Sequence, residues 1–153
     1  MTKKYIGTKT ITAWATEKDG VSGYTMKYAD GYASWSPKSA FEEAYRAIEG
    51  EGQNLSFGDA LHMLKLGKAV ARAGWNGKGM CLYLQNGSHD FVGYPDVVPG
   101  DIAGVPSAHF DRGDSGTVTR MPSVCMLTAG GQIVVGWTPN QIDMLASDWK
   151  VVV

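Results

Sequence analysis

Two groups of residues in this chain combine tryptophan with amide, hydroxyl and charged side chains at the ends of predicted strands. Their members are Arg72, Trp75 and Asn76 in the first group, and Trp137, Thr138, Gln141 and Asp143 in the second. An indole ring stacks on a nucleobase and contributes about 1–3 kcal/mol per base. Aspartate and amide groups hydrogen-bond to base edges or ribose hydroxyls, and free N–H groups at a helix start bind phosphate. These residue types suit a planar phosphorylated ligand, or else both tryptophans belong to the core and Thr138 only caps a helix.

Catalytic and metal-binding residues show no recognisable arrangement in the sequence. There is no Walker-type phosphate loop, no Gly-x-Ser-x-Gly elbow, and no serine or cysteine paired with histidine at a known spacing. The three histidines, His62, His89 and His109, have no second ligand at the spacing of a metal site. The carboxylates are scattered, which does not favour acid–base catalysis. We therefore predict a protein that is not an enzyme and that has no metal or cofactor.

Charge and composition restrict the class of ligand. The chain has 153 residues, 44% of them hydrophobic, and a formal net charge of −1. Its charges are evenly spread, so it lacks the basic stripe that long DNA or RNA requires, whereas a small anion needs only one or two cations. Cys81 and Cys125 lie in apolar strand patterns, as reduced core cysteines do. No apolar run approaches the ~18 residues of a membrane span and no signal region follows Met1, so we predict a cytoplasmic protein without membrane contact.

A predicted hairpin from Lys68 to Leu84 positions the first group. Two short strand-like stretches flank Asn76-Gly77, a pair typical of tight hairpin turns because both residues tolerate positive φ. Trp75 would lie at the tip, where it cannot pack under its own turn. We therefore expect its cover to be another subunit or a flat ligand.

The second group follows another predicted hairpin. Its strands are expected at residues 117–128 and 132–137. Thr138-Pro139 then resembles a helix cap followed by proline at the first helical position. The spacing of Ile142 and Leu145 predicts that both face the interior from this short helix. A last strand closes the chain.

The chain divides into two predicted parts. Residues 1–48 form a small β-rich accessory module with one helix, and residues 49–54 are a polar, glycine-broken linker. Residues 55–153 begin with a helix that Ser56 caps and Gly67 ends. Four strands, a helix and a strand follow. The predicted fold class is α+β, with an antiparallel sheet in the order α-β-β-β-β-α-β.

Within residues 1–48, three strand-like stretches precede one helix. They are Thr8–Thr16, Tyr24–Tyr28 and Tyr32–Trp35. Ser36-Pro37 then predicts a helix start, with the serine as cap. Most of the aromatic side chains in so small a module are expected in its core.

The second part resembles a known family through an ordered series of motifs. They are Phe57-Gly-Asp-Ala-Leu, Leu64-Lys-Leu-Gly-Lys, Val70-Ala-Arg-Ala-Gly-Trp-Asn-Gly-Lys-Gly-Met80, Gly136-Trp137 and Gln141-x-Asp143-Met-Leu-Ala-x-Asp148-Trp149. Residues 55–85 and 120–153 resemble small phage and prophage proteins that include the second Thoeris anti-defence family and a related anti-CRISPR protein. Residues 1–48 resemble an accessory segment of other phage proteins.

The resemblance implies a phage anti-defence protein that acts as a sponge in the cytoplasm of the bacterial host. Such proteins bind the cyclic nucleotide signal of Thoeris immunity, a cyclic ADP-ribose isomer, without cleaving it. Members form homotetramers, built as dimers of dimers, with ligand pockets where subunits meet. The ligand-binding candidates are then Arg72, Trp75, Asn76, Trp137, Thr138, Gln141 and Asp143.

Two other functions stay open from the sequence. The protein could instead bind and inhibit a bacterial defence nuclease, as the anti-CRISPR relative suggests, with residues 86–116 as the contact. It could also be a phage accessory or assembly protein in which residues 1–48 recruit a partner. Intact nucleotide retained by the protein would support the sponge, and co-purification with a nuclease would support the inhibitor. Loss of function on deletion of the first module would support a recruiting role for that module.

Overall fold

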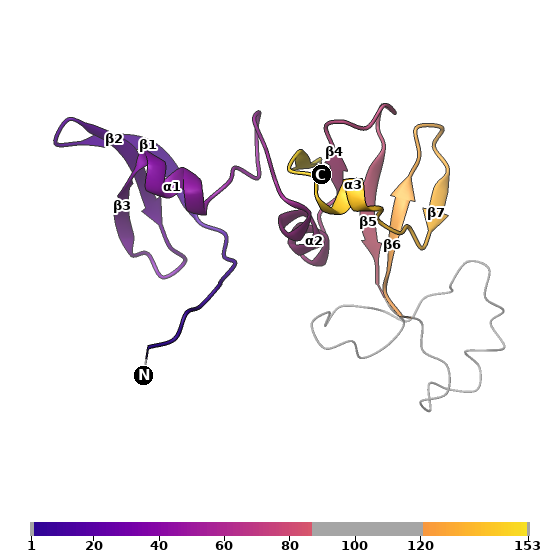
Figure 1. Ribbon diagram of the computed structural model, residues 1–153, viewed down its shortest axis with the longest axis horizontal. Helices are drawn as coiled ribbons and strands as arrows, with labels where there is room; N and C mark the ends of the chain where they lie inside the picture. The colour runs from indigo at the N-terminus through magenta and orange to yellow at the C-terminus, as the bar shows by residue number, and fades with distance from the viewer. Residues whose placement is uncertain (1, 87–120, 153) are drawn as a thin grey trace. The chain divides into compact units, whose positions relative to one another are not determined.

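The computed structural model describes residues 2–86 and 121–152 (Figure 1). The chain forms two compact units, Met1–Arg46 and Ala47–Val153. Each unit has its own antiparallel sheet, of three and five strands respectively. The predicted loop at 86–116, which contains His89 and His109, lies outside the described residues, apart from Asn86. No helix among the described residues is long and apolar enough to span a bilayer.

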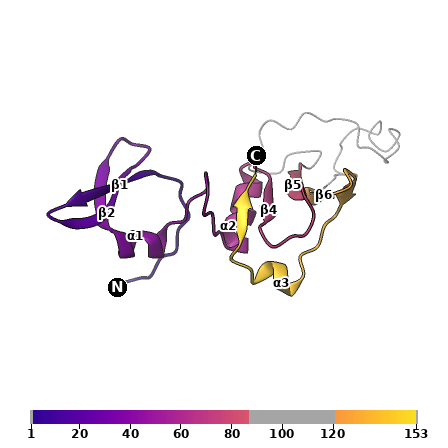
Figure 2. The ribbon, with the colours of Figure 1, turned by 90° about the horizontal axis from the view of Figure 1, so that it is seen from above.

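The N-terminal unit is a three-stranded sheet with one helix on it, in the order β1-β2-β3. Its elements are β1 (Thr12–Lys18), β2 (Val21–Lys27), β3 (Ala33–Pro37) and α1 (Lys38–Ala44). Figures 1 and 2 both show α1 against one face of this sheet. The Phe41 ring of α1 stacks on Tyr24 of β2 at 4.3 Å and on Tyr45 at 4.9 Å. These stacked rings are only partly buried, and Tyr5, Trp14 and Tyr32 are exposed, so the prediction that most aromatic side chains lie in the core of this module is not confirmed.

The start of α1 differs from the prediction. Ser36 lies in β3, where it pairs with Tyr24, and Pro37 occupies the N-cap without a side-chain cap bond. The prediction of Ser36 as the cap is therefore wrong. Its backbone is held by the strand ladder, so the helix can begin only after the last pair of that ladder, Gly23 with Pro37.

The C-terminal unit contains a five-stranded sheet in the order β7-β6-β5-β4-β8. Its elements are α2 (Phe57–Lys65), β4 (Val70–Arg72), β5 (Cys81–Gln85), β6 (Ser123–Leu127), β7 (Ile133–Val135), α3 (Gln141–Met144) and β8 (Trp149–Val151). All neighbouring strands pair antiparallel. This confirms the α+β class and the predicted order of elements.

A capping box fixes the start of α2. The Ser56 hydroxyl accepts a hydrogen bond from the Asp59 N–H at 3.2 Å, and the Asp59 carboxylate accepts one from the Ser56 N–H at 2.9 Å. Two N–H groups that the first helical turn leaves unpaired are thereby satisfied. Gly67 then has φ +81°, the left-handed conformation that ends a helix at low cost.

The core of the C-terminal unit lies between α2 and the sheet. Its fully or almost fully buried members are Leu55, Ala60, Met63, Leu64, Val70, Leu82 and Trp149. Residues just before α2 are tied to β8: Leu55 and Trp149 exchange backbone hydrogen bonds of 2.9 and 3.1 Å. The Gln53 amide also accepts from the Val151 N–H at 2.8 Å and donates to its carbonyl at 3.3 Å. Gln53 therefore continues the edge of this sheet.

The connection between β4 and β5 is longer than the predicted hairpin turn. The two strands share only the pair Val70 with Leu82, and neither Asn76 nor Gly77 has a positive φ. A Cβ at Gly77 would collide with the Met80 sulfur and would come within 2.8 Å of the Ala129 side chain. The prediction of an Asn-Gly turn is therefore wrong, because Gly77 is needed for close packing and not for a left-handed turn.

Candidate functional site

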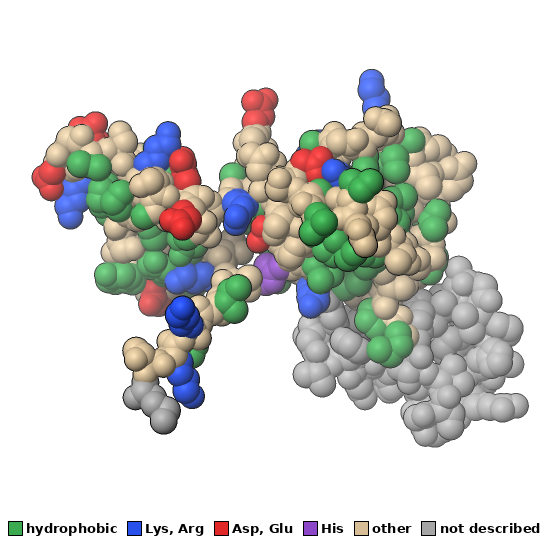
Figure 3. Space-filling model, viewed as in Figure 1, with side chains coloured by type: hydrophobic (Ala, Val, Ile, Leu, Met, Phe, Trp, Pro, Cys, Tyr) green, Lys and Arg blue, Asp and Glu red, His purple; other side chains and the backbone are tan. Residues whose placement is uncertain are grey.

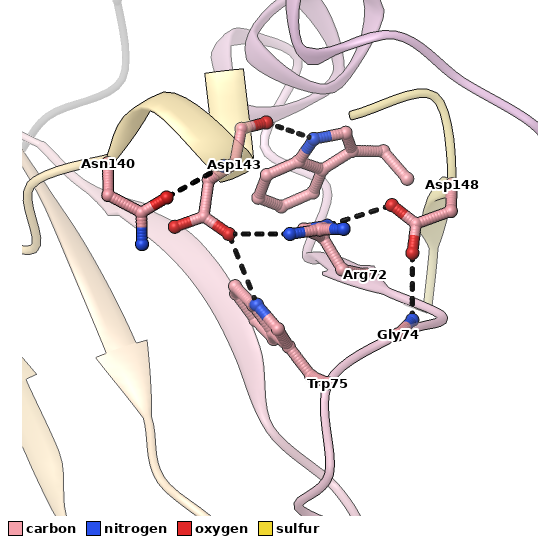
Figure 4. Close-up of polar contacts among 7 residues, drawn as sticks. Arg72, Gly74, Trp75, Asn140, Asp143 and Asp148 are labelled. Carbon is pink, nitrogen blue, oxygen red and sulfur yellow. Dashed lines mark hydrogen bonds and ion pairs between the residues drawn. The ribbon is translucent and has the colours of Figure 1, made fainter. Parts of the chain in front are cut away.

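Arg72, the last residue of β4, lies between two carboxylates (Figure 4). Its Nε donates to Asp148 Oδ1 at 2.8 Å, and its Nη1 donates to Asp143 Oδ1 at 3.0 Å. The side chains of Arg72 and Asp143 are only 15% and 8% exposed. Breaking such a pair by removing one partner is costly, because the remaining charge is left buried. The arginine thus joins β4 to α3 and to the residue that precedes β8.

Strand pairing brings Arg72 to Asp148. β4 runs antiparallel to β8 with Arg72 opposite Trp149, which places Asp148 beside the end of β4. The Ala73 N–H donates to the Asp148 carbonyl at 2.9 Å and the Gly74 N–H donates to its carboxylate at 2.8 Å. A Cβ at Gly74 would come within 2.9 Å of that carboxylate. Glycine at this position leaves room for the Asp148 side chain.

The short helix α3 carries its acidic residue inward and its apolar residues outward. Asp143 is 6% exposed, whereas Ile142 and Leu145 are 73% and 84% exposed. The prediction that Ile142 and Leu145 face the interior is therefore wrong. Because the helix spans four residues, it presents one side to the sheet. The ion pair with Arg72 makes this the side that carries Asp143.

The cap of α3 also differs from the prediction. Asn140 is the N-cap, and its side-chain oxygen accepts from the Asp143 N–H at 2.9 Å. Thr138 lies two residues earlier and is exposed. The predicted anion seat at Thr138 is therefore not formed by helix N–H groups, because the Asn140 side chain already binds one of them.

Three tryptophans pack edge to face beside this ion-pair network, and we refer to Trp75, Trp137 and Trp149 as the indole cluster. The ring centroids of Trp75 and Trp149 are 5.5 Å apart, and Trp137 lies 6.3 Å from each of them. The interplanar angles are 66–81°, the edge-to-face geometry that aromatic pairs prefer. Trp149 is fully buried, while Trp75 and Trp137 are half-buried at its side.

Asp143 connects the indole cluster to Arg72. The Trp149 Nε1 donates to the Asp143 carbonyl at 3.0 Å, and the Trp75 Nε1 reaches its carboxylate at 3.4 Å. Figure 4 shows the contact between Trp75 and Asp143. The expectation that Trp75 takes its cover from another subunit or a ligand is therefore wrong for most of the ring. Its cover comes from Trp137 and Trp149 of the same chain, and a part of the ring stays accessible.

The network leaves little free positive charge at Arg72. Its hydrogen bond lowers the pKa of Asp148 below the ordinary value, against the opposing effect of burial, and the Gly74 N–H adds to this. The hydrogen bonds to Asp148 and Asp143 in turn raise the pKa of Arg72. One guanidinium with two carboxylates carries a formal charge of about −1. Arg72 therefore acts chiefly to hold β4, α3 and the start of β8 together.

The comparison with family models matches this unit. A family model described as Tad2-like, the Thoeris anti-defense 2-like domain, matches residues 55–152. That range contains the whole ion-pair network and all three indoles. The chain belongs to this family. Among curated proteins, Thoeris anti-defense 2 of Bacillus phage SP01 is 32% identical over 98 residues, which cover 64% of this chain and 94% of that protein.

The family assignment confirms the resemblance noted in the sequence motifs. Membership in the Thoeris anti-defense 2-like family supports a phage anti-defence role. The family match begins at residue 55, just before α2, and so includes every element of the five-stranded sheet. The three-stranded unit lies outside it.

The seven predicted ligand-binding residues separate into two sets. The first set is brought together in the network and the indole cluster, and consists of Arg72, Trp75, Trp137 and Asp143. The second set, Asn76, Thr138 and Gln141, is exposed and makes no side-chain hydrogen bond within the described part of the chain. Asn76 and Thr138 directly follow the two half-buried indoles. Their polar groups are free to bind a ligand.

Sequence reasoning missed three residues of this arrangement. Asp148 and Trp149 complete the network and the cluster, and Asn140 caps the helix that carries Asp143. The sequence contained one signal for these residues, which is the Asp148-Trp149 pair at the start of the last strand. A carboxylate just before one strand can meet an arginine at the end of the antiparallel neighbouring strand. Within the described residues, no group of three or more His, Cys, Asp or Glu side chains could hold a metal ion.

Proposed function

We propose that the protein is an anti-defence sponge that binds a cyclic nucleotide immune signal, a cyclic ADP-ribose isomer, and releases it unchanged. The family assignment supports the anti-defence role. The observation that carries the proposal is the pair of half-buried indoles, Trp75 and Trp137, followed in the chain by the exposed polar residues Asn76, Thr138 and Gln141. Indole faces bind bases, and amide and hydroxyl groups bind ribose and phosphate oxygens.

Rigidity of the site supports tight binding. The indoles are held by edge-to-face contacts and by Asp143, which is itself fixed by Arg72 and by the Asn140 cap. A preformed site avoids the cost of ordering side chains when the ligand binds. A sponge that competes with an effector needs a Kd near the nanomolar range, about −12 kcal/mol. One stacked base with several hydrogen bonds in a fixed site is consistent with that affinity.

The state of the nearby carboxylates favours binding without cleavage. A general acid needs a pKa near neutrality, which burial away from cations produces. Asp148 has the opposite environment, since Arg72 lowers its pKa. Asp143 accepts hydrogen bonds from both Arg72 and Trp75. Both groups are therefore better suited to hold the site together than to transfer protons to a leaving group.

We further propose that a second copy of the chain covers α3 and β7, as in a homotetramer built from dimers. The exposed apolar side chains of these elements are Ile133, Val134, Val135, Ile142, Met144 and Leu145. Figure 3 shows hydrophobic side chains grouped on the face of this unit that carries α3. β7 is an edge strand, and residues 128–142 contain no charged residue. Monomers usually protect such an edge with charges.

Calorimetry with cyclic ADP-ribose isomers tests the sponge. We expect tight binding, and recovery of the intact ligand after heating the complex. Asn76→Ala and Gln141→Ala should each weaken binding about fivefold, the value of one hydrogen bond. Asn54→Ala, an exposed amide that bonds only to the Gly52 carbonyl, is the matched control and should bind as the parent does. Recovery of a cleaved product, or equal binding by all variants, would contradict the proposal.

Sedimentation velocity tests the proposed second copy. Leu145→Glu places a charge on an exposed helix position and should produce smaller species, whereas Lys65→Glu in α2 should not. The same apolar face favours one other function, the inhibition of a defence nuclease by direct contact. Co-purification of a nuclease with the parent but not with Leu145→Glu, together with no retained nucleotide, would support that alternative.

A further inference from the structure

The N-terminal sheet has one face that α1 does not cover. Alternation along the paired strands puts Tyr24 and Met26 on the covered face, where Tyr24 stacks on Phe41 of α1. The residues of opposite parity form the open face: Thr12, Trp14, Thr16 and Lys18 of β1, Val21, Gly23, Thr25 and Lys27 of β2, and Ala33, Trp35 and Pro37 of β3. A hydrogen bond of 2.9 Å between the hydroxyls of Thr16 and Thr25 agrees with this assignment.

Two indoles flank a threonine in the middle of the open face. Trp14 and Trp35 are both register partners of Thr25, one on each side. Trp14 is 47% exposed. A Cβ at Gly23 would come within 2.5 Å of the Trp35 ring, so glycine allows that indole to lie against β2. The two rings therefore belong to neighbouring positions on one surface, on strands about 10 Å apart.

The charges of the open face have one sign. It carries Lys18 and Lys27, and the Lys18 Nζ lies 6.0 Å from the centre of the Trp35 ring. Glu17, the one acidic residue of these three strands, has the opposite parity and belongs to the covered face. A face with lysines, threonine hydroxyls and indoles, and with no carboxylate from its strands, is complementary to a polyanion that has flat groups.

We propose that the open face of the N-terminal sheet binds a short stretch of single-stranded nucleic acid. Bases stack on Trp14 and Trp35, and the lysines contact the backbone phosphates. The Thr12 hydroxyl, and whichever of the Thr16 and Thr25 hydroxyls accepts in their mutual hydrogen bond, donate to phosphate and sugar oxygens. A proline-rich peptide also binds aromatic grooves, but it gains nothing from the lysines. With only two cations the binding is weak and salt-dependent, with a Kd of about 10 μM at low salt.

Fluorescence anisotropy of a labelled short oligothymidylate, titrated with the full chain at low salt, tests this proposal. Trp14→Ala should weaken binding at least about fivefold, the loss of one stacked base. Tyr32→Ala is the matched control: Tyr32 is 64% exposed but lies outside the sheet, and its loss should not change the affinity. Circular dichroism establishes that the variants keep their fold.

The salt dependence tests the role of the lysines. The slope of log K against log salt should fall by about 0.7 for each lysine removed, so the double variant of Lys18 and Lys27 to alanine should lose about 1.4. Lys38→Ala, on α1, should leave the slope unchanged. Absence of binding at low salt, equal affinity of Trp14→Ala, or a preference for a proline-rich peptide or for anionic vesicles would each overturn the proposal.

Discussion

Replacement of Arg72 by methionine should destabilise the C-terminal unit strongly. Methionine keeps most of the volume but removes the charge, so Asp143, 8% exposed at its side chain, would be left as a buried carboxylate without its cation. Removing one partner of a buried ion pair costs about 3–5 kcal/mol. Asp148 is 32% exposed and can be solvated again. We therefore expect a loss near the lower end, about 3 kcal/mol.

Urea unfolding followed by tryptophan fluorescence measures this loss. Because Trp14 and Trp35 lie in the other unit, the measurement uses a background in which both are phenylalanine, so that the signal comes from the indole cluster. For a unit of this size, 3 kcal/mol lowers the urea midpoint by about 2 M. The slope of the transition should stay the same.

A double-mutant cycle separates the ion pair from other effects of Arg72→Met. Asp143→Asn in the parent removes the charge of a partner that Arg72 needs, whereas in Arg72→Met it removes a charge that has no partner. The two substitutions should therefore be coupled by at least about 1.5 kcal/mol. A loss below about 1 kcal/mol for Arg72→Met, or additive effects, would refute the reasoning and would mean that solvent already screens the network.

Three further predictions concern stability. The free energy of unfolding should fall as the pH drops below about 4, because Arg72 lowers the folded-state pKa of Asp148. The ionised Asp148 contributes fully to stability above its unfolded-state pKa, and this contribution is lost as the pH falls through its folded-state pKa. Asp148→Asn should lack this pH dependence when stability is measured by urea titration. Gly74→Ala should lower the melting temperature, since its Cβ would lie 2.9 Å from the Asp148 carboxylate, whereas Gly58→Ala, with 3.6 Å to its nearest atom, should raise it. Deletion of residues 2–46 should leave the second unit folded by circular dichroism, while Gln53→Ala should destabilise this unit by about 2 kcal/mol, the value of two hydrogen bonds to β8.

Local signals in the sequence predicted the order of elements in the second unit. Ser56 caps α2 and Gly67 ends it because capping depends only on neighbours along the chain. The motifs also contain the aromatic and charged residues that the structure brings together. What these signals did not contain was the partner of each charged group. The pairing of Arg72 with Asp148 spans 76 positions in the chain, and only the antiparallel contact of β4 with β8 creates it.

Two of the errors share one physical cause, which is that tertiary contacts outweighed local preferences. Periodicity predicted Ile142 and Leu145 inside, but α3 turns Asp143 inward to meet Arg72. The Asn-Gly pair predicted a tight turn, but Gly77 is required by its packing on Ala129, which lies between β6 and β7. In both cases a close contact with a distant residue determined the local conformation. Propensities carry no information about such contacts.

The pairing of Arg72 also changes how a phosphorylated ligand would be recognised. A guanidinium that already donates to two carboxylates attracts a phosphate poorly, because the group as a whole carries a negative charge. The base of the ligand needs only the accessible part of the indoles, whereas its phosphates need donors from outside the network. Asn76, Thr138 and Gln141 supply neutral donors, and we propose that a second copy of the chain adds further positive charge. Sequestration and oligomerisation are for this reason parts of one proposal, and Leu145→Glu, which is aimed at assembly alone, should weaken ligand binding as well.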